Sequence, residues 1–215
     1  MQVTIFQSIK DTSTPFYRDV DVILERIKSG KSKEVINAIR KEKNKEERNK
    51  LKQKLPAICF SGTFNKRNDY SLIDHSGLIC LDFDGYPSRK DMMSARNEII
   101  ADKYVYSCFV SPSGDGLKVL VKIPKDSMNH KHYFNSLNEH FASDHFDVTS
   151  KNISRVCYES YDPLIHINEK AEIWTEIVQE VKSYSTDDVL LPKIRLTRTD
   201  EIIRRVLDRD WETNT

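Results

Sequence analysis

The chain has 215 residues, of which 38% are hydrophobic and 31% are charged; this favours one substantial domain with appendages, or two small domains, under a heavily solvated surface. Lys plus Arg number 34 and Asp plus Glu number 33, so the formal net charge is +1. A global basic charge is therefore excluded as an argument for nucleic-acid binding, which has to rest on local patches.

The cysteines and the N-terminus bear on the cell compartment. The cysteines form no CxxC pair, and their spacing suits neither a zinc site nor a disulfide framework: Cys59, Cys80, Cys108 and Cys157. We interpret them as reduced core thiols. The N-terminal sequence lacks the basic start and long apolar run of a signal peptide, and no apolar run approaches the roughly 18 residues that span a membrane. The sequence thus predicts a soluble, cytoplasmic protein without a membrane partner.

The N-terminal part of the chain is predicted to start with a strand at Val3–Phe6 and to continue in helices. One helix runs from about Asp19 to the stop at Ser29-Gly30, because apolar residues recur at i, i+3, i+4 and i+7: Val20, Ile23, Leu24 and Ile27. A second helix is marked by Val35, Ile36 and Ile39. The polar run Lys41–Lys54 is predicted as a solvated helix that Pro56 limits.

From Ile58 onward, short apolar runs alternate with helical patterns. Strands are predicted at Gly77–Asp84, Tyr104–Val110, Leu117–Ile123 and Val156–Tyr158. Helices are predicted after the capping box of Ser88 and Asp91, over the face of Tyr133, Phe134, Leu137 and Phe141, and over Ile173, Trp174, Ile177, Val178 and Val181. We expect one main domain over residues 1–183, a linker over 184–199, and over 200–215 the start of a further, truncated helical segment.

The strongest candidate site is the pair of acids in the sequence LDFDG. Because side chains alternate along a strand, Asp82 and Asp84 share one face while Leu81 and Phe83 point into a core. Two neighbouring carboxylates repel each other unless a cation lies between them, and hard oxygen ligands suit Mg²⁺ or Mn²⁺. Two-metal phosphoryl transfer uses such a platform. The alternative is a strand end that simply enters a turn, since Asp and Gly favour turns.

A second candidate is the loop SPSGDG, from Ser111 to Gly116, which joins two predicted strands. Ser113, Gly114 and Gly116 allow backbone N–H groups to turn toward an anion, and Lys118 adds a positive charge at the start of the next strand. A nucleoside triphosphate is the natural ligand. An ordinary hairpin turn explains the same residues, and the P-loop pattern GxxxxGK[ST] is absent.

A third, weaker candidate combines an acid with an arginine. Asp147 is a potential third metal ligand, and Arg155 is placed to pair with a phosphate or with the carboxylates. A surface salt bridge between the two is the simpler interpretation. None of the six histidines is assigned to a metal, because they show no pairing with an acid in one strand or helix.

In this order the motifs resemble the archaeo-eukaryotic primase superfamily, and within it the VirE N-terminal-like branch of primase-polymerases from bacterial mobile elements and phages. The motifs that carry the resemblance are DTSTPFYRDV, LPAICFSGTFNKR, HSGLICLDFDG, SPSGDGLKVLV and FDVTSKNISRVCYESYDP. The resemblance covers roughly Val3 to Trp174. It implies an α+β fold, with an RRM-like catalytic sheet flanked by helices and a smaller α/β portion.

The resemblance also implies a function: template-directed nucleotidyl transfer on single-stranded DNA, with Mg²⁺ or Mn²⁺ and nucleoside triphosphates. Asp82, Asp84 and Asp147 match the metal-binding and catalytic acids. The nucleotide-binding positions are Ser111, Ser113, Gly114, Gly116, Lys118 and Arg155. Lys118 departs from the family, because most active members have histidine there, and lysine can grip a phosphate only as a point charge.

Template contacts are predicted from local basic surface at Lys66 and Arg67, which would position the DNA backbone without reading its sequence. A helicase-like domain is expected C-terminal to the catalytic domain. Two alternatives stay open. One is a non-catalytic module that binds single-stranded DNA or nucleotide beside such a helicase-like domain; the other is a metal-dependent nuclease or phosphatase that uses the same acids.

Overall fold

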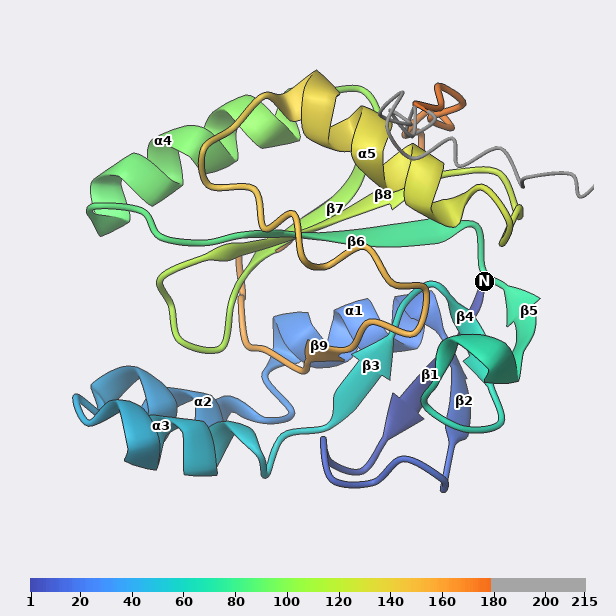
Figure 1. Cartoon of the computed structure of the whole chain (residues 1–215). Coiled ribbons are helices and arrows are strands. Elements are labelled where there is room, and N and C mark those ends of the chain that lie inside the picture. The colour runs from blue at the N-terminus through green and yellow to red at the C-terminus, as the bar shows by residue number, and fades with distance from the viewer. Residues whose placement is uncertain (179–215) are drawn as a thin grey trace, which may run out of the picture. The chain divides into compact units, whose positions relative to one another are not determined.

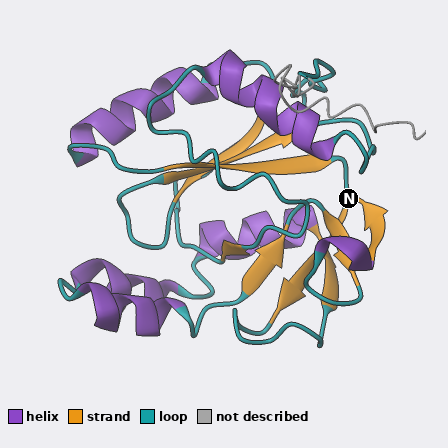
Figure 2. Ribbon diagram, viewed as in Figure 1, coloured by secondary structure: helices purple, strands orange, loops and turns teal. Residues whose placement is uncertain are grey.

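The computed structural model describes residues 1–178, which form a mixed helix-and-sheet domain with antiparallel sheets (Figures 1 and 2). The first sheet has the strand order β2 (Phe16–Asp19), β1 (Gln2–Phe6), β3 (Ala57–Cys59), β9 (Cys157–Tyr158). The second has the order β10 (His166–Ile167), β7 (Val105–Val110), β8 (Leu117–Lys122), β6 (Leu78–Phe83). A separate hairpin consists of β4 (Gly62–Phe64) and β5 (Leu72–His75), with the 3₁₀ helix η1 (Asp69–Ser71) between them.

The helices are arranged on both sides of the second sheet. Helices α4 (Arg89–Ile100) and α5 (His130–Phe141) cover one face, and α1 (Val20–Ser29) packs between the two sheets (Figure 1). Helices α2 (Lys33–Lys41) and α3 (Lys45–Lys52) form a hairpin beside the first sheet (Figure 1). None of the helices in residues 1–178 is long and apolar enough to cross a bilayer.

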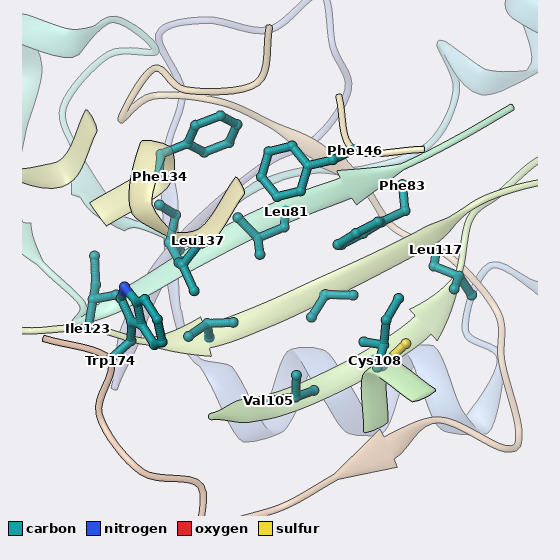
Figure 3. Close-up of a cluster of buried hydrophobic side chains, with 14 of the residues drawn as sticks. Leu81, Phe83, Val105, Cys108, Leu117, Ile123, Phe134, Leu137, Phe146 and Trp174 are labelled. Carbon is teal, nitrogen blue, oxygen red and sulfur yellow. The ribbon is translucent and has the colours of Figure 1, made fainter. Parts of the chain in front are cut away.

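Strand alternation divides the core into two parts. Ile79, Leu81 and Phe83 of β6 join the cluster under α4 and α5, and Figure 3 shows Leu81 and Phe83 on the side of Phe134 and Phe146. Leu78 and Cys80 point the other way and pack with α1 and the first sheet. The next two alternate positions are the acids, so Asp82 and Asp84 emerge on the inter-sheet side, at the end where the apolar packing stops.

Most predicted elements are confirmed, because their signals are local. The α1 helix ends at Gly30, whose φ of 80° is left-handed and therefore suits glycine. Ser88 caps α4 as predicted: its hydroxyl accepts from Asp91 N at 3.2 Å and donates to the Asp91 carboxylate at 2.7 Å. The solvated helix within Lys41–Lys54 is shorter than predicted, as Asn44 caps it and α3 occupies only Lys45–Lys52.

The helix predicted from Ile173 is wrong over the described residues, which are not helical there. Trp174 N donates to Lys122 O at 2.8 Å, and Ile173 bridges to Lys122 at the end of β8. The Trp174 side chain is buried, and its indole N–H donates to Ser136 Oγ at 2.8 Å. These tertiary contacts override the helical spacing of the apolar residues. Val181, the linker over 184–199 and the segment over 200–215 lie outside the described residues.

Candidate nucleotidyl-transfer site

Two charged residues face each other across the second sheet. The antiparallel register of β6 and β8 places Asp82 opposite Lys118, and the Lys118 ammonium contacts Asp82 Oδ2. The two side chains are only 14% and 13% exposed. Burial has the largest single effect and lowers the pKa of Lys118, but the charge and hydrogen bond of Asp82, together with Cys157 and Cys80, raise the pKa above its usual value. Lys118 is therefore a permanent cation beside the first acid of the motif.

The second carboxylate is held beside the first. Burial, followed by the negative charge of Asp82, raises the pKa of Asp84 to about 6, against the opposing effect of Lys118. Asp82 Oδ1 is buried and has no hydrogen-bond partner among residues 1–178. An orphaned carboxylate oxygen beside a carboxyl group that resists ionisation is a place where a further cation would be stabilised. Because both groups offer hard oxygen donors, the pair fits Mg²⁺ or Mn²⁺.

The loop between β7 and β8 closes over these acids. Ser111 N donates to Gly116 O at 2.8 Å, and Gly116 N donates to Ser111 Oγ at 3.2 Å. Gly114 has a φ of 83°, which disfavours any residue with a side chain. A Cβ on Gly116 would lie 1.9 Å from Asp84 Oδ1, so only glycine lets the loop approach this carboxylate. The glycines predicted to bind nucleotide thus first serve to shape the site.

Six of the predicted site residues line one cavity of about 200 Å³. Its lining includes both carboxylates, two serines of the loop, the two basic residues predicted to bind nucleotide and one lysine that the sequence did not single out: Asp82, Asp84, Ser111, Ser113, Lys118, Arg155 and Lys52. Pro112, Val156, Cys157 and Tyr158 complete the wall. The fold therefore brings together residues that lie up to 106 positions apart in the sequence, from Lys52 to Tyr158. They come from α3, β6, β8, the β7–β8 loop and the β9 region.

Asp147 is close to the pair through its backbone, but its side chain is engaged elsewhere. Its N–H donates to Asp82 O at 2.8 Å, while its carboxylate accepts from Thr149 N, Thr149 Oγ1 and Ser150 Oγ at 3.0, 2.7 and 2.7 Å. Burial opposes the effect of these hydrogen bonds and of Arg155, but the pKa of Asp147 is still lowered. Arg155 Nη2 donates to Asp147 at 3.3 Å, the salt bridge that the sequence allowed.

The structure does not place Asp147 with the other two acids as a set of three ligands. Its carboxylate does not line the cavity, and in residues 1–178 no group of three or more His, Cys, Asp or Glu side chains is arranged to hold a metal ion. Lys66 and Arg67 also lie outside the cavity lining, in the loop that follows β4, where Arg67 N donates to Thr12 O at 2.9 Å.

Sequence reasoning missed the basic residues that the α2–α3 hairpin brings to the site. Arg40 Nη2 donates to Ser111 O at 3.1 Å and to Tyr161 O at 2.8 Å. Arg48 pairs with Asp115 of the loop at 3.9 Å, and Lys52 follows it at i+4. That spacing was readable as one side of a helix, but nothing local indicated that this side faces the SPSGDG loop.

Comparison with known proteins shows one family match and one similar solved structure. The family described as "BT4734-like, N-terminal domain" matches residues 50–166, a range that contains every predicted site residue. Among solved structures, the AEP domain of the primase-polymerase (PrimPol) of cyanophage S-2L is similar with a TM-score of 0.41 and 11% sequence identity, over 81% of this chain and 83% of that chain. No curated protein matches the chain.

The family match does not mention the VirE N-terminal-like branch, so membership of that branch stays a prediction. The matched range, residues 50–166, is more than half of the 215 residues. It runs from the end of α3 to β10 and contains the second sheet, but leaves out β1 and β2 of the first. The chain belongs to the BT4734-like N-terminal domain family.

Proposed function

We propose that this chain is a DNA primase-polymerase domain that catalyses metal-dependent, template-directed nucleotidyl transfer on single-stranded DNA. The observation that carries the proposal is the Asp82–Asp84 pair, in which the nearly buried Asp82 has an orphaned carboxylate oxygen, in a cavity that also presents basic side chains and a glycine-containing loop. Phosphoryl transfer needs both the carboxylates and the basic groups, because hard oxygen ligands hold the metal while cations and N–H groups bind phosphate. The order β6–α4–β7–β8–α5 supports an RRM-like catalytic sheet.

In this proposal Asp82 and Asp84 hold Mg²⁺ or Mn²⁺. When bound, the ion supplies Lewis-acid stabilisation of the charge that develops during transfer. Lys118 and Arg155 neutralise the phosphates, and the β7–β8 loop with Ser111 and Ser113 fixes their position. Asp147 aligns the end of β6 through its backbone and orients Arg155. Direct ligation by Asp147, which the motif resemblance implies, requires its carboxylate to release the bonds from Thr149 and Ser150.

The remaining parts of the proposal concern partners. Lys66 is exposed in the loop after β4 and is assigned, with Arg67, to contacts with the phosphate backbone of a single-stranded template. A helicase-like domain is proposed to act beside this one, in the cytoplasm of a bacterium or of a phage-infected cell. These partners are proposed because the motifs resemble those of primase-polymerases.

A second function is favoured by the Lys118–Asp82 contact. An internal ammonium already occupies one oxygen of the first acid, and Lys118 stands where most active primases have histidine. A domain in which this ion pair stays closed would bind nucleotide or single-stranded DNA without chemistry. The two functions differ in a single measurable property, which is metal-dependent product formation.

The experiment is primer extension and de novo synthesis on homopolymeric single-stranded DNA, with Mg²⁺ or Mn²⁺ and each labelled dNTP or NTP in turn. The matched control is the Asp82→Asn/Asp84→Asn variant, which keeps side-chain size and removes charge. We expect incorporation of the nucleotide complementary to the template, reduced on the order of 100-fold or more in the variant. Binding of DNA and nucleotide without product would support the binding module, and strand degradation without template dependence would support the nuclease.

A further inference from the structure

Lys52, the last residue of α3, is a basic residue of the cavity whose charge has no ion-pair partner in the described chain. It lines the same cavity as Asp84 and Lys118. Lys118 contacts Asp82 and Arg155 contacts Asp147, whereas the Lys52 ammonium makes no hydrogen bond or ion pair within residues 1–178. Of the three cations that line the cavity, Lys52 is therefore the one whose charge is available to a ligand.

The surroundings of Lys52 are also those of an anion site. Burial lowers the pKa of Lys52, and the attraction of Asp115 and Asp84 does not offset it. The half-buried ammonium has thus lost part of its hydration without a matching partner, and a bound anion would supply one.

Three contacts fix the position of Lys52 relative to the loop over the acids. Arg40 in α2 donates to Ser111 O, and Arg48 in α3 pairs with Asp115. The hairpin is also anchored by an apolar cluster in which Ile36, Ile39 and Leu55 are buried and Leu51, Tyr158 and Tyr161 pack against them. Leu51, the residue before Lys52, thus packs against the same cluster as Tyr158, which lines the cavity. Lys52 is therefore held in place by its helix.

We propose that Lys52 binds the phosphate chain of the incoming nucleotide, which makes the α2–α3 hairpin part of the nucleotide site. This rests on the function proposed above and adds a residue and an element that the motifs did not contain. The charges support a polyphosphate: two carboxylates face three basic side chains, and a divalent cation on the carboxylates leaves the cavity strongly positive. The shared cavity places Lys52 at the ligand of Asp82 and Asp84, away from the exposed Lys66.

The test measures affinity for inorganic triphosphate and for a non-hydrolysable dNTP analogue, by calorimetry with Mg²⁺ present. The variant is Lys52→Met, which keeps the aliphatic stem and removes the charge. The control is Lys50→Met on the same helix, because Lys50 is exposed and pairs with Glu47 at 2.6 Å. We expect Lys52→Met to weaken binding of both ligands about 10-fold, a loss of about 1.4 kcal/mol. Lys50→Met should bind like wild type, and Lys52→Arg should retain most of the affinity.

Kinetics separate binding from a structural role. In active protein, Lys52→Met should raise KM for the nucleotide with a much smaller change in kcat, at unchanged thermal stability. Unaltered triphosphate affinity together with weaker binding of single-stranded DNA would overturn the proposal and assign Lys52 to the template. Equal triphosphate affinity in Lys52→Met and Lys50→Met would also overturn it.

The outcome is independent of the proposed polymerase activity. If wild type forms no product under any condition, weaker triphosphate binding by Lys52→Met still establishes the anion site, and only the polymerase is lost. If wild type forms product and Lys52→Met binds and reacts like wild type, the polymerase stands and the role of Lys52 is refuted.

Discussion

The two faces of strand β6 differ in what they do for the protein. On one face Leu81 and Phe83 are fully buried against α5 and the segment around Phe146 (Figure 3). The Phe83 ring contacts the rings of Phe141 and Phe146 at centroid distances of 5.6 and 5.2 Å. On the other face the Asp82 side chain is 13% exposed and has an orphaned oxygen, whereas Asp84 is more exposed and has its pKa raised to about 6.

The comparison shows that one face of the strand stabilises the fold through apolar packing, whereas repulsion between the carboxylates on the other face destabilises it. Apolar packing gains free energy from every contact, whereas two neighbouring carboxylates in a poorly hydrated cavity lose it. The second face is tolerated because the first anchors the strand. Substitutions on the two faces should therefore separate stability from ligand binding, and the following predictions are arranged from the largest effect to the smallest.

The largest effect is expected on the apolar face, at Phe134. Its side chain is 1% exposed, and its ring lies 5.1 Å from that of Phe146. Phe134→Ala should lower the free energy of unfolding by about 3–5 kcal/mol, because it removes buried surface and leaves a cavity. Urea denaturation followed by circular dichroism measures this, and triphosphate affinity below the transition should stay near that of wild type. A loss under 1 kcal/mol would show that this face does not carry the stability assigned to it.

The next effect concerns the ion pair on the polar face. Lys118→Met should destabilise by about 3 kcal/mol, because it leaves Asp82 buried and uncompensated. The double variant Asp82→Leu/Lys118→Met should recover most of that loss, since an apolar pair needs no desolvation of charge. Chemical denaturation of the two single variants and the double variant measures the coupling. Equal instability of Lys118→Met and the double variant would contradict the view that the pair costs folding energy.

A smaller effect is expected where the loop meets the acid. Gly116→Ala places its Cβ 1.9 Å from Asp84 Oδ1 and 2.7 Å from Phe83 O, so the loop or the carboxylate has to move. We expect a loss of about 1–3 kcal/mol in stability and weaker Mn²⁺ binding, measured by electron paramagnetic resonance.

The matched control for that substitution is Gly85→Ala. A Cβ at Gly85 would meet nothing within 4 Å, although its φ of 79° makes alanine strained there. Gly85→Ala therefore reports conformational strain alone, at roughly 1 kcal/mol. If both variants bind Mn²⁺ equally, the close approach of Gly116 to Asp84 is not what shapes the metal site.

The effect that is smallest near neutral pH, and that grows as the pH decreases, involves two buried histidines that are paired with each other. His75 Nε2 and His130 Nδ1 lie 3.1 Å apart, and His75 Nδ1 accepts from Gly77 N at 3.0 Å. Burial, with His75 adding to it, lowers the pKa of His130 to about 3. Between that value and the unfolded value near 6.5, the unfolded state binds the extra proton, so stability falls as the pH decreases.

Each such proton contributes a slope of about 1.4 kcal/mol per pH unit at most. The variant His130→Asn keeps an acceptor for His75 and removes the titrating ring, so its unfolding free energy should depend less steeply on pH between about 6.5 and 4. Thermal unfolding across this range is the measurement. Parallel pH curves for wild type and variant would show that His130 does not titrate as its burial requires.

The site was only partly predictable, as two residues show. Asp84 was identified because an acid at i+2 from another acid must share its face in any strand. Asp147 was grouped with it through the motif resemblance, but Thr149 and Ser150 lie two and three residues later and capture its carboxylate. Competition between a local turn and a distant ligand site is decided by three-dimensional placement, which spacing along the chain does not encode.

By itself the sequence determined a strand, predicted over Gly77–Asp84 and found as Leu78–Phe83, the shared face of Asp82 and Asp84, the boundaries of α1 and the capped start of α4, since alternation, periodicity and caps act within a few residues. Only the tertiary structure decided that Lys118 lies opposite Asp82, that Lys52 reaches the cavity and that residues 173–178 are not helical. Those outcomes depend on strand register and on packing between distant segments. The free energy of such contacts belongs to pairs of elements, so no single stretch of sequence specifies it.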